Sequence, residues 1–273
     1  MRRVRFARAV RLVLAGIRAS GPALFAAPGV ALAAVTAPRV DQADVAAWFD
    51  ATYRDKGFRY LRPARAYPIF IQLLGLRARQ RHLDVACGPG LVMRAALARD
   101  ITTSGVDLSE AAIALAKRSH PELDARVGNA ESLPFADGTF DGVTCIGSLE
   151  RFLDRERALR EMVRVSTPSA RFCFLVRNAS TLVWRVWREG LGRREVAGHQ
   201  DAQTLDAWHA LFSRCGLRVV RVLPDQWPRQ RWLQLLPGQR PQPGRFEAVT
   251  SGWLPLRWCN ELVFVLERGD ADD

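Results

Sequence analysis

The amino-acid sequence predicts an α/β protein with a parallel sheet at its centre, and three observations support this. Short apolar segments typical of buried strands alternate with longer segments whose apolar residues recur at helical spacing. A glycine-rich turn, Cys87 to Gly90, stands between the first such strand and the helix that follows it. The chain has 273 residues and a hydrophobic fraction of 48%, enough for a sizeable core. Strands that alternate with helices in this way form a parallel sheet with helices on both faces.

The expected elements follow one another from residue 42 onward. Seven apolar segments bounded by turn residues are expected to be strands: 82–86, 102–108, a short strand near Arg126, 140–147, 170–176, 217–223 and 260–267. Six segments have helical spacing: 44–54, 64–76, 90–100, 109–119, 149–165 and 204–216. Ser109 is a candidate N-cap of its helix, and Gly216 is expected to close the last one.

The chain divides into a tail, residues 1–40, and one α/β domain, residues 41–273. Two stretches inside the domain lack a clear strand or helix pattern, residues 178–203 and 224–258. The second stretch separates the last two strands by far more than an ordinary connection does. We expect both stretches to be elaborations of the domain.

Residues 1–40 differ from the rest of the chain, with seven arginines and no acidic residue. The basic start and apolar middle are similar to a signal peptide. However, the middle is mostly alanine interrupted by glycine and proline, which makes a poor membrane-spanning helix. Two interpretations stay open. One is a basic amphipathic helix, residues 4–17, that rests on an anionic membrane surface. The other is a disordered tail, or an upstream stretch outside the natural reading frame.

The net charge of +12 comes almost entirely from arginine. A basic balance favours nucleic acid, anionic lipid or an acidic substrate as a partner. The arginines are spread along the chain without interleaved aromatic residues, so we expect a solvated basic surface and no nucleic-acid partner. The five cysteines form no CxxC pair. We therefore expect reduced thiols in a cytoplasmic protein, with no metal site and no disulfide framework.

The stretch Leu83 to Gly90, LDVACGPG, carries the first functional signal. A glycine-rich turn between a strand and a helix lets a ligand approach the backbone at a helix N-terminus. Asp84 stands just before this turn, where a carboxylate would repel a pyrophosphate and attract an amino group or a sulfonium. Asp107 closes the next strand, where a carboxylate can accept hydrogen bonds from ribose hydroxyls. The expected ligand therefore carries positive charge near the turn and a ribose beyond it.

Two further motifs follow at ordinary spacing, VGNAESLPF after the third strand and FDGVTCIGSLERF along the fourth. With these four motifs in order, the sequence resembles the class I S-adenosylmethionine-dependent methyltransferases, especially the small-molecule group that includes ubiquinone and menaquinone methyltransferases. The resemblance is good over residues 80–180 and looser over 45–267. It implies a Rossmann-like, seven-stranded, mostly parallel sheet whose last strand is antiparallel. It also implies S-adenosyl-L-methionine as the cofactor.

The resemblance further implies which residues bind this cofactor. For the methionine part they are Asp84, Ala86, Gly88, Gly90, Cys145 and Ile146, and for the adenosine part Asp107, Leu108, Asn129 and Ala130. Asp84 would hold the methionine amino group through water, and Asp107 would bind the ribose. The family often has aspartate where this chain has Asn129, and asparagine keeps a carbonyl acceptor for the adenine amino group.

The end of the fourth strand limits the kind of acceptor. Enzymes that methylate the exocyclic amino groups of bases carry an Asp/Asn-Pro-Pro-aromatic tetrad there, and this chain has CIGS from Cys145 to Ser148. Some relatives have Glu-His just after this strand, whereas this chain has Glu150-Arg151, so an imidazole base is absent at that place. We therefore expect a small-molecule acceptor and leave the catalytic residue open.

Two residues are candidates for a general base, and each has a structural alternative. Glu150 is close to the motif but is equally suited to the first turn of a helix, where the dipole stabilises an acid. His199 precedes the helix that starts near Thr204, where relatives often carry a histidine. Its alternative role is to satisfy a loop carbonyl.

Seven of the eight tryptophans lie after residue 180, four of them in the proline-rich stretch 224–258. One interpretation is a flap that covers an aromatic or lipid-linked acceptor or contacts a membrane. The other is that the rings cover the edge of the sheet. The helix around Trp48 and Tyr53 is expected to cap the cofactor.

Three functional interpretations follow from these observations. The first is a methyltransferase that acts on a small molecule, aromatic or lipid-linked. The second is a peripheral methyltransferase of a quinone or a glycolipid, held at the inner face of a membrane through residues 1–40 or 224–258. The third is a non-catalytic S-adenosylmethionine-binding regulatory protein, which the missing Glu-His pair keeps open.

Overall fold

The computed structural model describes residues 40–181, 184, 201–225 and 255–269. Three features predicted from the sequence fall wholly or mostly outside these ranges. They are the tail 1–40, the candidate base His199, and the tryptophan-rich stretch 224–258. The structural statements below concern the described ranges.

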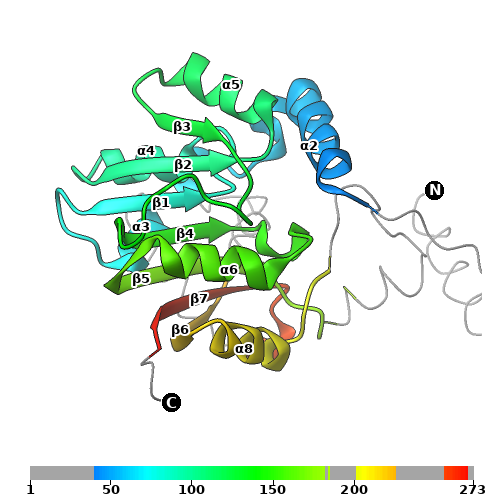
Figure 1. Ribbon diagram of the computed structural model, residues 1–273. Helices are drawn as coiled ribbons and strands as arrows, with labels where there is room; N and C mark the ends of the chain where they lie inside the picture. Colours follow the sequence, from blue (N-terminus) through cyan, green and yellow to red (C-terminus); the bar gives the residue numbers. More distant parts are fainter. Residues whose placement is uncertain (1–39, 182–183, 185–200, 226–254, 270–273) are drawn as a thin grey trace, which may run out of the picture. The chain divides into compact units, whose positions relative to one another are not determined.

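A seven-stranded sheet forms the centre of the described fold, in the order β3-β2-β1-β4-β5-β7-β6 (Figure 1). Its strands are β1 (Arg81–Val85), β2 (Thr102–Asp107), β3 (Asp124–Val127), β4 (Phe140–Ile146), β5 (Ser166–Arg177), β6 (Leu217–Pro224) and β7 (Glu261–Arg268). Strands β1 to β5 pair in parallel, and β7 lies antiparallel between β5 and β6. The expected seven strands and antiparallel last strand are confirmed.

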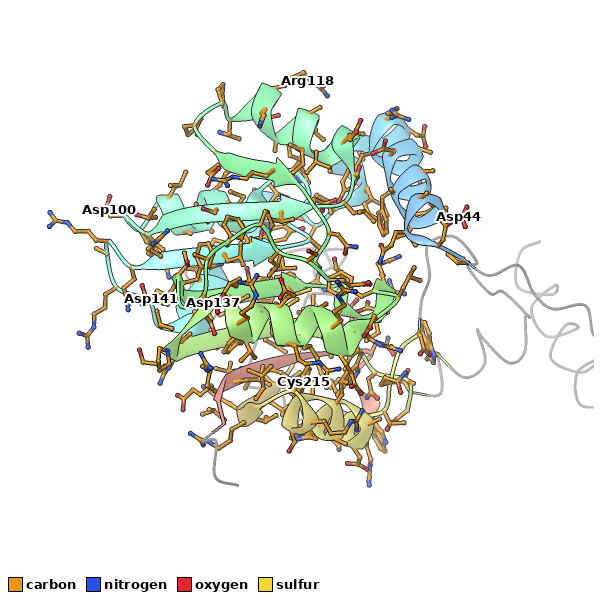
Figure 2. The ribbon with its side chains drawn as sticks, viewed as in Figure 1. Asp44, Asp100, Arg118, Asp137, Asp141 and Cys215 are labelled. Carbon is orange, nitrogen blue, oxygen red and sulfur yellow. The ribbon has the colours of Figure 1, made fainter. Side chains whose placement is uncertain are left out.

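Helices cover both faces of this sheet (Figure 1). They are α2 (Gln42–Lys56), α3 (Pro68–Leu74), α4 (Leu91–Leu97), α5 (Glu110–Ser119), α6 (Arg155–Arg164) and α8 (Leu205–Arg214). One buried cluster joins α6 and α8 to the sheet, and a second joins α3 and α4 to its other face. Figure 2 shows side chains filling the space between the layers, while charged residues such as Asp100 and Arg118 lie exposed at the rim.

The helix expected over residues 149–165 is wrong in its first part. The structure has a short 3₁₀ helix, Leu149–Arg151, then extended backbone at Phe152, and α6 begins only after Asp154. The physical reason is an N-cap in the middle of the helical pattern, because the Asp154 carboxylate accepts a hydrogen bond from Arg157 N at 2.9 Å. The 3₁₀ turn places Ser148 and Arg151 at the end of β4 rather than along a helix.

The order of the strands determines where a ligand can bind. Strand β1 pairs with β2 on one side and with β4 on the other, so the strand order reverses between β1 and β4. In open α/β sheets a crevice forms outside the carboxyl ends of the strands at such a reversal. The sequence motifs at the ends of β1, β2 and β4 therefore meet at one place.

Helix α2 is attached beside this crevice by a contact with α5. The Asp50 carboxylate accepts hydrogen bonds from the Ser109 hydroxyl at 2.6 Å and from Ala111 N at 3.0 Å. These donors belong to the first turn of α5, where the helix dipole favours a negative charge. The contact holds α2 close to the carboxyl end of β2.

Candidate functional site

The turn after β1 brings the backbone close to the crevice. Ala86, Gly88 and Gly90 all have positive φ angles, 58°, 53° and 78°. A Cβ atom on Gly88 would lie 2.7 Å from the Tyr53 hydroxyl, and one on Gly90 would lie 2.5 Å from Leu123 Cδ1. The bare Cα of Gly88 thus makes room for the phenol of α2, whereas that of Gly90 makes room for core packing.

Asp84 ends β1 as a deeply buried carboxyl group, 2% exposed. Its Oδ1 accepts a hydrogen bond from the Thr144 hydroxyl at 2.6 Å, and its Oδ2 has no hydrogen-bond partner among the described residues. Burial raises the pKa of Asp84 to about 7, and the nearby Asp107 carboxylate adds to this rise. A buried carboxylate oxygen without a partner is costly, and a cationic ligand group would satisfy it.

Asp107 ends β2 and is held in a fixed orientation by the backbone. Its Oδ2 accepts a hydrogen bond from Gly88 N at 2.8 Å, and its Oδ1 accepts one from Ser109 N at 2.8 Å. Burial raises the pKa of Asp107 to about 6, although the two N–H donors act in the opposite direction. The carboxylate therefore joins the glycine-rich turn to the start of α5.

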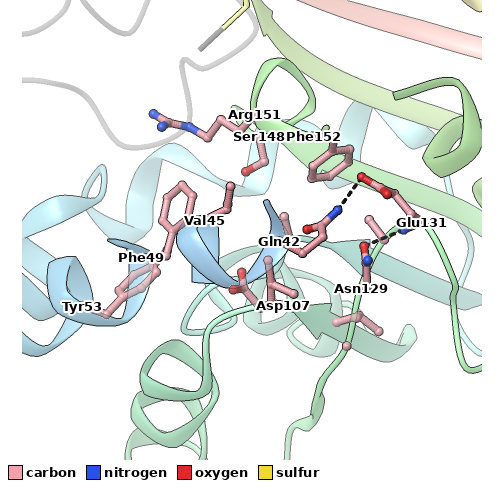
Figure 3. A pocket seen from close by; sticks show the side chains of 15 residues that line it. Gln42, Val45, Phe49, Tyr53, Asp107, Asn129, Glu131, Ser148, Arg151 and Phe152 are labelled. Carbon is pink, nitrogen blue, oxygen red and sulfur yellow. Dashed lines mark hydrogen bonds between the residues drawn. The ribbon is translucent and has the colours of Figure 1, made fainter. Parts of the chain in front are cut away.

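Two adjoining cavities open at the carboxyl ends of the strands. The first, about 570 Å³ with its open mouth, is lined by Gln42, Val45, Phe49, Tyr53, Ala86, Val106, Asp107, Leu108, Gly128, Asn129, Ala130, Glu131, Ser148, Arg151 and Phe152 (Figure 3). The second, about 490 Å³, is lined by Phe49, Tyr53, Tyr60, Leu61, Tyr67, Asp84, Ala86, Cys87, Gly88, Leu91, Val92, Ile146, Gly147, Ser148 and Arg151. They share five wall residues, so one long ligand can occupy both.

Most of the residues expected to bind the cofactor line these cavities. The first holds Ala86, Asp107, Leu108, Asn129 and Ala130, and the second holds Asp84, Ala86, Gly88 and Ile146. Gly90 and Cys145 line neither cavity. The Cys145 side chain is fully buried in the core on the α6 and α8 side of the sheet. The Asn129 carboxamide oxygen accepts a hydrogen bond from Glu131 N at 2.9 Å, which shapes the turn after β3.

The structure does not bring the Glu150 carboxylate into either cavity. Glu150 is fully buried, and Arg177 Nε lies 3.5 Å from its Oε1. Neither carboxylate oxygen has a hydrogen bond in the described part of the chain. In this arrangement the Glu150 carboxylate faces Arg177. It belongs to the lining of neither cavity.

Several wall residues were not among those expected to bind the cofactor. Helix α2 contributes Gln42, Val45 and Phe49. The 3₁₀ turn after β4 contributes Arg151, whose guanidinium carbon lies 5.9 Å from the centroid of Trp48 and 5.3 Å from that of Phe49. This cation–π contact fixes α2 against the end of β4. Among the predictions from the sequence, only the capping role expected for the helix around Trp48 and Tyr53 indicated that this helix contributes to the site.

The wall of the second cavity that contains Tyr60, Leu61 and Tyr67 is tied to the C-terminal strands. Arg62, in the same segment, binds Asp225 at 2.7 Å and also pairs with Glu261. Asp225 directly follows β6, and Glu261 is the first residue of β7. The Arg62 guanidinium is largely buried, so these pairs are stronger than exposed surface pairs.

The residues present fit S-adenosylmethionine. The unpartnered Asp84 Oδ2 suits the cationic amino group, and Asp107 stands where ribose hydroxyls would reach it. Within the described ranges, no group of three or more histidine, cysteine, aspartate or glutamate residues could hold a metal ion. None of the helices in the described part of the chain has both the length and the apolar character that crossing a membrane requires.

The fold and this pair of cavities are those of a Rossmann-like α/β protein with a ligand site at the carboxyl ends of its strands. Residues 83–174 match a family model described as a methyltransferase domain. The family and the fold imply S-adenosylmethionine as the cofactor.

Individual relatives agree with this assignment. The chain is 30% identical over 175 residues to a demethylmenaquinone methyltransferase of Paenarthrobacter aurescens, a match that covers 60% of this chain and 64% of the relative. It is 28% identical over 181 residues to norajmaline N-methyltransferase of Rauvolfia serpentina, covering 64% and 57%. A solved structure from Thermotoga maritima, described as a SAM-dependent methyltransferase and possible histamine N-methyltransferase, superposes with a TM-score of 0.58. That structural match has 18% identity and covers 80% of this chain and 97% of the other.

The curated relatives are matched only in part. The chain spans 64%, 44% and 47% of the length of three demethylmenaquinone methyltransferases. The part of the chain that matches the family model, residues 83–174, contains the four motifs up to Phe152. We therefore argue the chemical class of the acceptor from the residues that line the cavities.

Proposed function

We propose that this protein is an S-adenosylmethionine-dependent methyltransferase that acts on a small, apolar and aromatic acceptor. The observation that carries the proposal is the pair of buried carboxyl groups, Asp84 and Asp107, placed along two cavities that share a wall. Each carboxyl group matches one polar end of the cofactor. Ordinary core packing gives no reason to bury two acids 23 residues apart in sequence at one sheet edge.

The two cavities divide the ligand between them. The first has Asp107, Leu108 and Asn129 along its wall and suits adenosine, with the ribose at the carboxylate and the base beside the apolar side chain. The second has Asp84 at its base and suits the methionine part. The remaining space of the second cavity, toward Tyr60 and Tyr67, is left for the acceptor.

The chemistry needs alignment and a dry site more than it needs a catalytic side chain. When bound, the cofactor supplies a methyl group on a cationic sulfur. Asp84 would hold the amino group and Asp107 the ribose, and these two contacts would fix the orientation of the methyl donor. Phe49 and Tyr53 contribute aromatic rings to the wall that the two cavities share. Apolar surface of this kind excludes water and strengthens the electrostatic interactions inside the site.

The wall of the second cavity supports this acceptor class. Phe49, Tyr53, Tyr60 and Tyr67 provide aromatic surface, and Leu61, Leu91, Val92 and Ile146 provide aliphatic surface. An aromatic ring with an apolar substituent, such as a quinol, fits this lining better than a strongly charged molecule does. The relative named demethylmenaquinone methyltransferase supports the same class.

A second candidate function is cofactor binding without methyl transfer. Asp84 is the one carboxyl group among the described residues that line the second cavity, and it is committed to the cofactor. If His199 or another residue supplies no base, acceptors that need deprotonation are excluded. An acceptor with a thiol, an amine or an activated carbon avoids this requirement.

The experiment that tests the function is calorimetric titration of S-adenosylhomocysteine and S-adenosylmethionine into the wild type and Asp107→Ala. We expect micromolar binding to the wild type and about 10- to 100-fold weaker binding to the variant, as for loss of hydrogen bonds to a charged group. A melting curve controls for folding, because Asp107 also holds two backbone N–H groups. No binding to folded wild type would contradict the proposal. Quinols and other phenols are then screened for a mass gain of one methyl group.

Peripheral membrane association is a further part of the proposal, supported by the seven arginines of residues 1–40. We expect the protein to sediment with vesicles that contain anionic lipid and not with neutral vesicles. The deletion of residues 1–40 tests the source of the binding. Equal sedimentation of the truncated protein with anionic vesicles would exclude this segment as the anchor.

A further inference from the structure

Four polar side chains form a buried row beneath the cofactor site. His82 and Asp84 lie two residues apart on β1 and therefore on the same face of the sheet. Thr103 pairs with His82 across to β2, and Thr144 pairs with Asp84 across to β4. The row thus crosses three adjacent strands.

Three hydrogen bonds connect these side chains end to end. His82 Nδ1 lies 2.9 Å from the Thr103 hydroxyl oxygen, and His82 Nε2 lies 2.9 Å from that of Thr144. The Thr144 hydroxyl is in turn 2.6 Å from Asp84 Oδ1. The row ends at the same carboxyl group whose second oxygen, Oδ2, has no partner among the described residues.

His82 has no exposed surface, and burial lowers its pKa to about 3. The imidazole is therefore neutral at physiological pH, with one nitrogen that donates a hydrogen bond and one that accepts. Thr103 and Thr144 are also buried. Each hydroxyl can donate only one hydrogen bond, so the direction of one bond in the row determines the direction of the next.

An ionised Asp84 sets this direction, because a carboxylate can only accept. The Thr144 hydroxyl must then donate to Asp84, which leaves its oxygen as an acceptor for His82. His82 Nε2 must carry the proton, and Nδ1 must accept from the Thr103 hydroxyl. A protonated Asp84 removes this requirement, because its carboxyl group can donate to Thr144.

We propose that His82 is a positioning residue of the cofactor site, which acts through Thr144 to hold ionised Asp84 with Oδ2 directed at the cofactor's amino group. The proposal rests on the proposed cofactor binding. The Nε2–H group of His82 donates a hydrogen bond to the Thr144 hydroxyl oxygen. The hydroxyl proton is thereby held toward Asp84 Oδ1. Without this donor the hydroxyl can rotate, and the orientation of the carboxylate loses its support.

The first test is the tautomer of His82 in the complex with S-adenosylhomocysteine. The chain has four histidines, so their ¹⁵N resonances can be resolved in a protein labelled at histidine, and His82→Phe assigns the signal. We expect His82 to be protonated at Nε2 and unprotonated at Nδ1 throughout pH 6–8. The Nδ1–H tautomer or a charged imidazole in the complex would overturn the proposal.

The second test compares Thr144→Val with Thr144→Ser by calorimetry with S-adenosylhomocysteine. Valine has the shape of threonine without the hydroxyl, and serine keeps the hydroxyl. We expect the dissociation constant to rise about 10-fold for valine and to change less than about 3-fold for serine. Equal affinities of the two variants would refute the proposal.

The outcomes separate this inference from the proposed function. Failure of the wild type to bind S-adenosylhomocysteine contradicts the function itself. Binding by the wild type together with the wrong tautomer, or with unchanged affinity of Thr144→Val, contradicts only the role of His82. If Thr144→Val does not fold, the tautomer in the wild-type complex decides alone.

Discussion

Asp84 and Asp107 differ from surface carboxyl groups because burial keeps part of each population protonated near neutral pH. The pKa of Asp84 rises to about 7 and that of Asp107 to about 6. The other titratable groups that interact with Asp84 are Tyr67, Cys87 and Cys145. Burial raises their pKa values too, so they stay neutral over the same range. Near neutral pH, the change in protonation of this buried group of residues in the ligand-free protein therefore comes from Asp84 and Asp107.

The first prediction concerns stability as a function of pH. A carboxyl group whose folded pKa is raised stabilises the folded state fully below its unfolded pKa, which is near 4. This contribution is lost as pH rises through the folded pKa of about 7. We expect the melting temperature of the ligand-free protein to fall between pH 5 and pH 8. The Asp84 contribution is at most about 4 kcal/mol.

Asp84→Asn provides the control for this prediction, because an amide does not titrate. The variant should lose most of the fall in melting temperature between pH 6 and 8 and keep the part due to Asp107. Binding of S-adenosylhomocysteine should show the opposite trend in the wild type and tighten from pH 6 to 8, since the amino group requires ionised Asp84. Affinity independent of pH would contradict this account.

The second prediction concerns Gly88. Alanine at this position would bring its Cβ 2.7 Å from the Tyr53 hydroxyl, in addition to the strain of a φ angle of 53°. We expect Gly88→Ala to weaken S-adenosylhomocysteine binding about 10-fold or more and to lower stability by about 1–2 kcal/mol. Calorimetry and thermal unfolding measure the two effects.

Gly138→Ala is the matched control, because Gly138 has a φ angle of 61° but a Cβ atom added to it would meet no other atom within 4 Å. This variant carries the backbone strain without the clash. It should lose a similar amount of backbone stability and keep the wild-type affinity. Equal affinity losses in the two variants would show that the contact between Gly88 and Tyr53 is unimportant for the site.

Most of the cavity-lining residues at the strand ends were predictable from the sequence because each follows a strand and belongs to a local motif. The role of His82 was not predictable in the same way. Its partners Thr103 and Thr144 are 21 and 62 residues away, and only the pairing of three strands brings them together. A lone histidine at the start of a buried strand gives no sign of this register.

Helix α2 is the element on which the shape of the site depends most. It supplies walls to both cavities, yet its attachment consists of a few polar and aromatic contacts. The chief contact runs from Asp50 to the first turn of α5.

The third prediction is that Asp50→Ala loosens this helix. The variant loses the hydrogen bonds from Ser109 and Ala111 N, worth about 2 kcal/mol in a partly buried setting. We expect lower stability and faster dissociation of S-adenosylhomocysteine, measured by stopped-flow displacement. Asp55→Ala removes an exposed acid from the same helix and should match the wild type. Identical dissociation rates for the two variants would contradict the attachment through Asp50.

The elements themselves were largely predictable, and their errors have local causes. The helical pattern of residues 149–165 continues through the 3₁₀ turn, because Leu149, Phe152 and Leu159 are all suited to the apolar side of a helix. The N-cap at Asp154 overrides this pattern. The attachment of α2 was beyond prediction from the sequence, since Asp50 and Ser109 are 59 residues apart.

At the scale of the whole molecule, the fourth prediction concerns stabilisation by ligand. S-adenosylhomocysteine at 100 times its dissociation constant should add about 2.7 kcal/mol to the free energy of unfolding. For a chain of this size the melting temperature should rise by about 5–10 °C. Adenosine and methionine, each filling one cavity, should give smaller shifts. A full shift with adenosine alone would contradict the shared use of both cavities.

The fold class was predictable because alternating strands and helices allow few arrangements. The seven strands, the mostly parallel sheet and the antiparallel β7 agree with the expected architecture. The wall around Tyr60 and Tyr67 was less accessible to prediction. This segment lies before the first motif in the chain. Asp225 and Glu261, the residues that hold it through Arg62, lie in the C-terminal part of the sequence.

Arg62 fixes this wall to the ends of β6 and β7, whereas the wall around Asp107 depends on β2, β3 and α5. The two halves of the site are thus held by different strands of one sheet. On the proposed division of the site, we expect exchange of the last two strands together with the segment around Arg62 to change the acceptor preference and to leave cofactor binding intact. In this sense the same cofactor site can serve different acceptors, because changes on the side around Arg62 alter the acceptor preference alone.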